Sequence, residues 1–345
     1  MRAVDVFAGA GGLTVGLQKA GFDVVAAIEA APIPSATYAA NHARTRLVVD
    51  DVRSVGRAEL DVGSGSIDLL AACPPCQGFT SLAAKWRRTD PRNVLVLEVA
   101  RLAEELRPRV VMLENVPRLA TTGSELLAEL RNRLHSVGYV LSEGVLQAAH
   151  YGSPQSRKRL VLVASKVGRI ELPAPTHGDG RRPLRTVRQA LRIMKEEPRQ
   201  FTLESGRRMA ADDWHVVRSV RPATLSRIQA TAAGGVRSQL PEELRPVCHR
   251  GSDKGFMNVY GRMSWDEPAP TITGGCTTFS KGRFGHPEHD RTISVREAAL
   301  LQEFPRRYKF KTTSIDAACE MIGNAFPTSL ARAVARQVAK RLQEA

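Results

Sequence analysis

Several side chains that could do chemistry stand where apolar, strand-like runs of this chain begin or end. Cys76 follows the run Ile67–Ala72 and two prolines, and Glu114 directly follows a second apolar run. Arg157 and Arg159 stand at the start of a third. Because prolines cannot continue a central strand, the chain must turn just before Cys76, at the edge of a sheet. α/β enzymes place their chemistry at such an edge.

The types of these residues suit covalent catalysis. A cysteine becomes a usable nucleophile near neutral pH when positive groups lie close, and Arg157, Arg159 and the basic run Lys85–Arg88 could supply that field. Glu114, at the end of an apolar strand, could be kept protonated by burial and act as an acid. Simpler roles for these residues are also open at this point. Cys76 could be a small buried apolar side chain, Glu114 a solvated acid at a strand end, and the two arginines contacts to phosphate.

A second thiol, Cys73, forms a Cys-x-x-Cys pair with Cys76. A zinc site would need a further Cys/His pair at ligand spacing, and the sequence offers only the adjacent, isolated Cys248 and His249. A redox pair normally opens a helix, whereas the residues after Cys76 have the character of a loop. We therefore expect neither a metal site nor redox chemistry here.

A glycine turn near the N-terminus indicates a nucleotide site. The run Val4–Phe7 leads into Ala8-Gly9-Ala10-Gly11-Gly12, and helical spacing begins at Leu13. Glycines let the backbone approach a ligand, although the turn lacks the third glycine of the dinucleotide fingerprint. Two later strand ends carry acids: Glu29 suits ribose hydroxyls, and Asp51 suits an adenine amino group. Together the three strand ends favour a ligand that contains adenosine.

The segments that must position these residues alternate between strand and helix. Strands are expected at Val4–Phe7, Asp23–Ile28, Leu47–Val52, Ile67–Ala72, Arg109–Leu113, Tyr139–Ala148 and Arg159–Ala164. Helices are expected over about 93–106 and from Ser124 to about Val137, where leucines keep a spacing of three and four. Alternation of this length predicts a doubly wound α/β sheet. A length of 345 residues predicts one large and one smaller domain.

The charge of the chain points to a polyanionic partner. It carries 50 Lys and Arg against 35 Asp and Glu, a net charge of +15. Nucleic acid is the first candidate and an acidic membrane the second, with solvated basic faces as the alternative. No stretch approaches the roughly 18 apolar residues of a membrane span, and Met1 leads straight into a strand pattern without a signal peptide. Five dispersed cysteines do not form a disulfide framework, so we expect a cytoplasmic protein.

In chain order, these motifs strongly resemble those of DNA (cytosine-5) methyltransferases. The motifs are the glycine turn, Glu29, Asp51, Pro75-Cys76-Gln77, Glu114-Asn115-Val116, Gln155-x-Arg157-x-Arg159, Arg296-Glu297-Ala298-Ala299-x-Leu301-Gln302 and Gly323-Asn324-Ala325-Phe326-Pro327. They cover the chain almost end to end, apart from a middle segment that also varies within the family. The resemblance implies a Rossmann-like fold that depends on S-adenosylmethionine, with a second, smaller target recognition domain.

The resemblance assigns residues 1–167 and 291–345 to the catalytic domain and 168–290 to the target recognition domain. It implies cofactor contacts from Phe7, Ala8, Gly9, Gly11, Gly12, Leu13, Glu29, Asp51, Val52, Pro75, Asn324 and Ala325. Glu29 would hold the ribose of S-adenosylmethionine, and Asp51 and Val52 its adenine. Asn324 and Ala325 would close the site from the C-terminal end. S-adenosylhomocysteine would be the product.

The implied reaction methylates carbon 5 of a cytosine that is flipped out of double-stranded DNA. Cys76 would attack carbon 6 and so make carbon 5 electron-rich. Glu114 would protonate or hydrogen-bond N3, and Arg159 would contact the carbonyl oxygen, with Arg157 supporting the loop. The basic loop Gly78–Asn93 would close over the DNA.

The middle segment, rich in Pro, Gly and Arg, would read base edges in the major groove. Residues 265–275 and 283–286 are its loop-rich candidates for DNA contact. After it, Ser294 and Glu297 form a capping box that predicts a helix to about Phe304. A basic C-terminal helix from Ser329 would pack back on the large domain.

Two alternatives to the leading hypothesis remain open. The same fold could methylate cytosine in tRNA, or the chain could be a DNA-binding homologue without catalysis. We expect a monomer in the prokaryotic cytoplasm, associated with the nucleoid, that serves either a restriction–modification system or solitary methylation of the host DNA.

Overall fold

The computed structural model describes residues 1–345 except 64, 76–77, 79–89, 203–209, 212 and 252–257. Cys76, Gln77 and most of the loop expected to close over DNA therefore lie outside the described residues. The chain divides into two compact units. The first unit comprises residues 1–151, 158–176 and 326–345, and the second comprises 152–157 and 177–325. Residues 291–325, expected in the catalytic domain, thus make most of their contacts within the second unit. The division into a catalytic and a recognition domain concerns function and stays a prediction.

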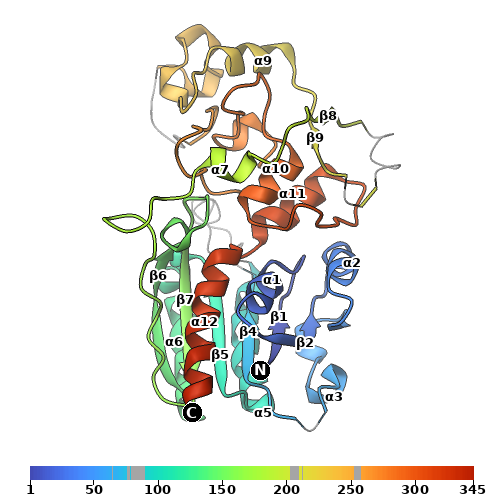
Figure 1. Ribbon diagram of the computed structural model, residues 1–345, viewed down its shortest axis with the longest axis vertical. Coiled ribbons are helices and arrows are strands. Elements are labelled where there is room, and N and C mark those ends of the chain that lie inside the picture. Colours follow the sequence, from blue (N-terminus) through green and yellow to red (C-terminus); the bar gives the residue numbers. More distant parts are fainter. Residues whose placement is uncertain (64, 76–77, 79–89, 203–209, 212, 252–257) are drawn as a thin grey trace. The chain divides into compact units, whose positions relative to one another are not determined.

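The first unit contains a seven-stranded sheet with the order β3-β2-β1-β4-β5-β7-β6 (Figure 1). Its strands are β1 (Arg2–Val6), β2 (Asp23–Ile28), β3 (Arg46–Val48), β4 (Leu69–Ala72), β5 (Val110–Asn115), β6 (Val140–Gln147) and β7 (Lys158–Ser165). Strands β1 to β5 pair in parallel, whereas β7 runs antiparallel to both β5 and β6. The predicted α/β fold is confirmed, with an antiparallel pair at one edge of the sheet.

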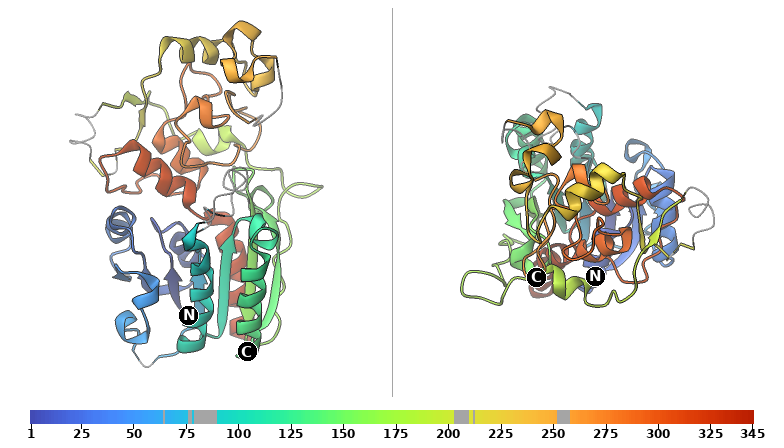
Figure 2. Two further views of the ribbon diagram at one scale, coloured as in Figure 1. Left: turned by 180° about the vertical axis from the view of Figure 1, so that it is seen from behind. Right: turned by 90° about the horizontal axis from the view of Figure 1, so that it is seen from above.

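Helices cover both faces of this sheet (Figures 1 and 2). They are α1 (Gly12–Gln18), α2 (Pro32–Asn41), α3 (Arg57–Leu60), α5 (Glu98–Leu106), α6 (Ser124–Ser136) and α12 (Thr328–Glu344). Alternate residues of a strand point to opposite faces. Val111 and Leu113 of β5 therefore pack with α5 and α6, and Val110 and Met112 pack with α1 and α12. None of the helices in the described part of the chain has the length and apolar character of a membrane span.

The second unit is rich in loops. Its elements are α7 (Val187–Leu191), β8 (Arg199–Gln200), β9 (Val216–Val217), α9 (Pro222–Gln229), α10 (Val295–Leu301) and α11 (Ile315–Asn324). Arg262 is 6% exposed, and its guanidinium donates to the main-chain oxygens of His286 at 2.8 Å and of Glu288 at 3.0 Å. Buried main-chain groups need such partners, so this arginine helps to fix loops that no sheet holds.

Element boundaries differ from the sequence prediction by more than two residues in three places. The strand expected over Leu47–Val52 ends at Val48, and the helix expected over 93–106 is a 3-10 helix over Pro91–Leu97 before α5 begins at Glu98. The capping box of α10 is confirmed, because Ser294 Oγ accepts from the amide of Glu297 at 3.0 Å. That helix ends at Leu301 rather than Phe304, since Glu303 adopts the left-handed region with φ 70°.

The C-terminal helix α12 packs on α1 within the first unit, as predicted. A Cβ atom at Gly16 would lie 2.5 Å from the Cβ of Ala331 and 3.2 Å from the carbonyl oxygen of Thr328. The two helices thus approach so closely that only glycine fits at position 16. Leu330, Val334 and Val338 of α12 are buried in the same cluster.

Gly16→Ala should lower the free energy of unfolding by about 1–3 kcal/mol, because the added methyl group overpacks the interface between α1 and α12. Ala331→Gly alone should cost about 1 kcal/mol through helix propensity. Since Ala331→Gly removes the atom nearest to the new methyl group, the double variant should lose less than the sum of the single losses. Urea unfolding of the four proteins measures this coupling, and strict additivity would contradict the close packing.

Candidate active site

Glu114 and Arg159 form an ion pair where β5 ends. The Nε atom of Arg159 lies 2.5 Å from Oε1 of Glu114, and the two side chains are only 11% and 8% exposed. Because β5 and β7 are antiparallel, with Glu114 opposite Val161, the start of β7 lies beside the end of β5. Glu114 and Arg159, both expected from the sequence to be catalytic residues, are therefore in direct contact.

The turn that leads to Cys76 is fixed to the same strand end. Asn115 is 1% exposed, and its side-chain amide donates to the carbonyl oxygen of Pro74 at 3.2 Å. Its Oδ1 accepts from the amide of Val116 at 2.8 Å. The sequence named Asn115 as part of a motif and missed this role. The chain is thus anchored two residues before Cys76, which itself lies outside the described residues.

Cys73, the other thiol of the Cys-x-x-Cys pair, lies beside Glu114. Burial raises the pKa of the Cys73 thiol well above its usual range, and the charges of Glu114 and Asp5 raise it further. A thiol in this environment contains little thiolate near neutral pH. Cys73 is therefore a poor nucleophile.

Arg157 lies in the second unit, where its guanidinium is a main-chain anchor. It is 3% exposed and donates to the carbonyl oxygens of Ile272 at 2.7 Å and Gly323 at 2.8 Å. Gln155 belongs to the same anchor, because its Oε1 accepts from the amide of Ile272 at 2.8 Å. A buried guanidinium with these partners is not placed to contact a phosphate at the surface. The contacts agree with the expectation that Arg157 supports the loop. A direct part for Arg157 in catalysis stays a prediction.

The glycine turn between β1 and α1 is held by Glu29, at the end of β2. Phe7, Gly9 and Gly11 have positive φ angles of 60°, 55° and 91°. Glu29 accepts from the amide of Gly9 through Oε2 and from the amide of Ala31 through Oε1, both at 2.8 Å. A Cβ atom at Gly9 would meet no atom within 4 Å. The turn therefore borders open space that a ligand could fill.

The residues present fit a cofactor that contains adenosine. Besides Glu29, Asp51 offers a charged carboxylate, because hydrogen bonds from Arg53 lower its pKa to about 2. Val52 beside it is buried and apolar. The other expected contacts of the first unit are Phe7, Ala8, Gly9, Gly11, Gly12, Leu13 and Pro75, and those of the second unit are Asn324 and Ala325. Acidic acceptors at two strand ends next to an open glycine turn suit ribose and adenine.

A buried polar network beneath the glycine turn was missed by the sequence reasoning. The hydroxyl of Thr14 donates to Oδ2 of Asp5 at 2.6 Å and lies 2.8 Å from the hydroxyl of Tyr38. Burial, the largest cause, raises the pKa of Asp5 to about 7. The one signal in the sequence is an acid inside the otherwise apolar run Val4–Phe7.

Asp5→Asn should stabilise the protein in a pH-dependent way. Because the pKa of Asp5 rises from 3.8 to about 7 on folding, the folded state holds its proton more tightly and the wild type loses stability as pH rises through this window. Asparagine mimics the neutral acid, so the gain should reach up to about 4 kcal/mol at pH 8 and vanish near pH 3.5. Chemical unfolding across this range measures it. Stability curves that run parallel for the two proteins would contradict the shift.

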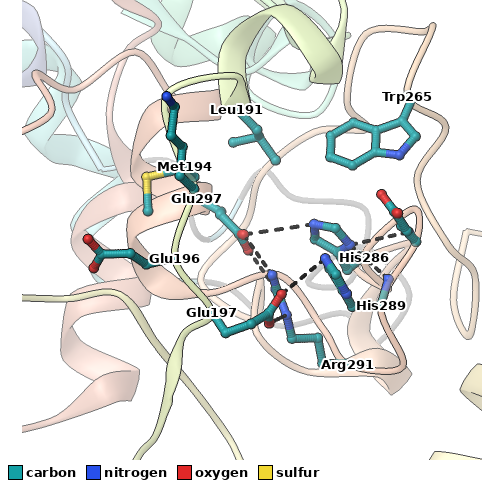
Figure 3. Close-up of a pocket in the computed structure, with 11 residues that line it drawn as sticks. Leu191, Met194, Glu196, Glu197, Trp265, His286, His289, Arg291 and Glu297 are labelled. Atoms are coloured by element: carbon teal, nitrogen blue, oxygen red, sulfur yellow. Dashed lines mark hydrogen bonds and ion pairs between the residues drawn. The ribbon is translucent and has the colours of Figure 1, made fainter.

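The second unit contains a small cavity of about 160 Å³, shown in Figure 3. Two of its charged groups form a close ion pair: Arg291 donates to the two carboxylate oxygens of Glu297 at 2.9 and 3.0 Å. Trp265 and His286, candidates for DNA contact, lie at the same cavity, and burial lowers the pKa of His286 to about 3. Glu297 also caps α10, accepting from the amide of Ser294 at 2.7 Å. The bonds of Glu297 thus hold the start of α10, and His286, only 3% exposed, packs inside the second unit.

The fold and the site together define a class of protein: a Rossmann-like methyltransferase that depends on S-adenosylmethionine. Comparison with known proteins gives the family. The model of the C-5 cytosine-specific DNA methylases matches residues 1–340, and the chain belongs to this family. It is therefore a DNA (cytosine-5) methyltransferase.

Named relatives agree with this assignment. The chain is 39% identical to the type II methylase M.HgiDII of Herpetosiphon aurantiacus, covering 99% of this chain and 95% of the relative. It is 32% identical to the type II methyltransferase M1.HphI of Haemophilus parahaemolyticus, over 98% and 86% of the two chains.

Solved structures share the fold. A prophage-encoded E. coli chain, named as a DNA modification methyltransferase, superposes with a TM-score of 0.74 at 22% identity over 99% of both chains. The Dnmt2 methyltransferase of S. pombe gives a TM-score of 0.67 at 17% identity, over 100% of this chain and 98% of its own.

Proposed function

We propose that this enzyme methylates cytosine through a covalent bond to Cys76, with Glu114 and Arg159 activating the ring. The observation that carries the proposal is the buried ion pair of Glu114 and Arg159, next to the strand end where Asn115 anchors the turn that precedes Cys76. An acid and a cation are thereby held together at the edge of the sheet.

The chemistry requires residues of these types. Carbon 5 of cytosine is a poor nucleophile, so the Cys76 thiolate adds to carbon 6 and makes carbon 5 electron-rich. For this step Glu114 must carry a proton: it then donates a hydrogen bond or proton to N3, while Arg159 donates to the carbonyl oxygen, so both stabilise the negative charge that develops on the ring. When bound, S-adenosylmethionine supplies the methyl group as an electrophile. Loss of the proton from carbon 5 and departure of the Cys76 thiolate then restore the aromatic ring.

The cofactor site lies at the strand ends of the first unit. There, Glu29 holds the ribose and Asp51 with Val52 holds the adenine, while Phe7, Pro75 and the glycine turn line the rest. The motif that the chain shares with the family adds Asn324 and Ala325 to the expected cofactor contacts. Support comes from Glu29 at the end of β2, from Asp51 three residues after β3 and from the open space beside Gly9.

The substrate is a short, specific sequence in double-stranded DNA, read by a target recognition domain over 168–290. The net charge of +15 suits this polyanion, and the type II methylases among the relatives suit a restriction–modification system. The target base is flipped out, and the basic loop Gly78–Asn93 closes over it. We place the enzyme as a monomer in the cytoplasm, associated with the nucleoid.

Duplex DNA that carries 5-fluorocytosine at the target should trap the wild-type enzyme when S-adenosylmethionine is present, because fluorine cannot leave as a proton. The complex should survive denaturing electrophoresis. Cys76→Ala should form no adduct and should lose methyl transfer by at least about 1,000-fold, since the covalent route is then closed.

Cys73→Ala is the matched control, as it removes a thiol three positions away and should still form the adduct. An adduct with Cys76→Ala, or none with the wild type on DNA that it methylates, would contradict the proposal. Transfer of labelled methyl groups to tRNA instead of duplex DNA would favour the RNA-acting alternative.

A further inference from the structure

We propose that Tyr38 and His42, near the end of α2, are positioning residues of the cofactor site that hold the glycine turn in its binding geometry. Neither residue belongs to the set expected to touch the cofactor. The inference rests on the proposed role of the glycine turn in binding S-adenosylmethionine, and it adds a second layer of residues to that role.

Tyr38 connects α2 to α1 and β1 through a chain of buried hydroxyls. Thr14 has a single hydroxyl proton and donates it to Asp5 at 2.6 Å. The hydroxyl of Tyr38 lies 2.8 Å from the same Thr14 oxygen and continues the chain of hydrogen bonds. All three side chains are 0% exposed, so water cannot replace these bonds. Thr14 lies in the first turn of α1, just after the glycines.

His42 continues the chain to the glycine turn itself. Its ring centroid lies 4.6 Å from that of Tyr38, and the ring makes a hydrogen bond to the main chain of Gly11. Burial lowers the pKa of His42 to about 4, so the ring is neutral at physiological pH. Gly11 precedes α1 with φ 91°, and its carbonyl also accepts from the amide of Val15 at 3.1 Å. His42 thus fixes the residue where the turn becomes a helix.

The glycine turn is therefore held at two points by one stretch of chain. Glu29, at the end of β2, binds the amide of Gly9, and His42 follows directly after α2 and binds Gly11. Glycine has little conformational preference of its own at these positive φ angles. Contacts from outside the turn must select its shape. Preorganisation of this kind contributes affinity for a ligand, because the turn need not be ordered when the ligand binds.

The test separates this role from ordinary core packing. Tyr38→Phe deletes one buried hydroxyl, and Tyr139→Phe is its matched control in the same unit. Tyr139 is 1% exposed and donates to the carbonyl oxygen of Pro108 at 2.6 Å, at the start of β6 and away from the glycine turn. Both variants should lower the melting temperature by similar amounts.

Titration calorimetry with S-adenosylmethionine and S-adenosylhomocysteine, without DNA, gives the decisive readout. Tyr38→Phe should raise both dissociation constants roughly fivefold, the effect of one lost hydrogen bond, and Tyr139→Phe should leave them unchanged. His42→Ala should weaken binding about tenfold. His42→Asn or His42→Gln should recover part of the loss, because an amide can donate to Gly11 again. In kinetics, the KM for the cofactor should rise while the single-turnover rate at saturation stays near that of the wild type.

Equal cofactor affinities of Tyr38→Phe and Tyr139→Phe, both folded, would overturn the inference while leaving the cofactor site itself intact. A wild-type protein that does not bind S-adenosylmethionine at all would instead overturn the proposed cofactor site. Should His42→Ala fail to fold, the comparison of the two tyrosine variants still decides.

Discussion

The proposed active site depends on one interaction, the ion pair between Glu114 and Arg159 at the end of β5. Both side chains are about nine-tenths buried, so each would be strongly destabilising without the other. Only the antiparallel pairing of β5 with β7 brings an acid from one strand to an arginine at the start of the other. The seven-stranded sheet, packed on both faces, is what keeps these two strand ends in register. Asn115, next to Glu114, then ties the turn before Cys76 to the same place.

The cofactor half of the site follows the same physical rule. Buried hydrogen bonds fix the polar groups at the strand ends. The space beside Gly9 stays open, and a ligand could fill it. Glu29 holds Gly9, while the buried chain from Asp5 through Thr14 to Tyr38 lies beneath the turn. Asp5 is costly as a charged group there, since burial raises its pKa to about 7. The protein tolerates a strained and polar arrangement at its proposed site, as functional sites commonly do.

Local pattern was sufficient to predict most of the sheet and the residues at its strand ends. Apolar runs and the capping box of Ser294 and Glu297 are signals within a few residues, so β2 and the start of α10 could be placed from sequence. Contacts between segments that are distant in the sequence could not be predicted in this way. Arg157 donates to the carbonyl oxygens of Ile272 and Gly323, which follow it in the chain by 115 and 166 positions. Every residue has a main-chain carbonyl, so the sequence does not indicate which carbonyl will accept. The network beneath the glycine turn was missed for the same reason, because a tyrosine in a helix and a histidine just after it look like ordinary core and surface residues.

A double-mutant cycle at Glu114 and Arg159 tests the central claim most directly. Glu114→Gln, Arg159→Gln and the double variant would be compared with the wild type in single-turnover methyl transfer to duplex DNA. If the two residues act as one unit, each single change should slow transfer by at least about 100-fold, and the double variant should be little slower than the slower single variant. Rate losses that simply multiply would contradict the account, because they would show that the acid and the arginine act independently.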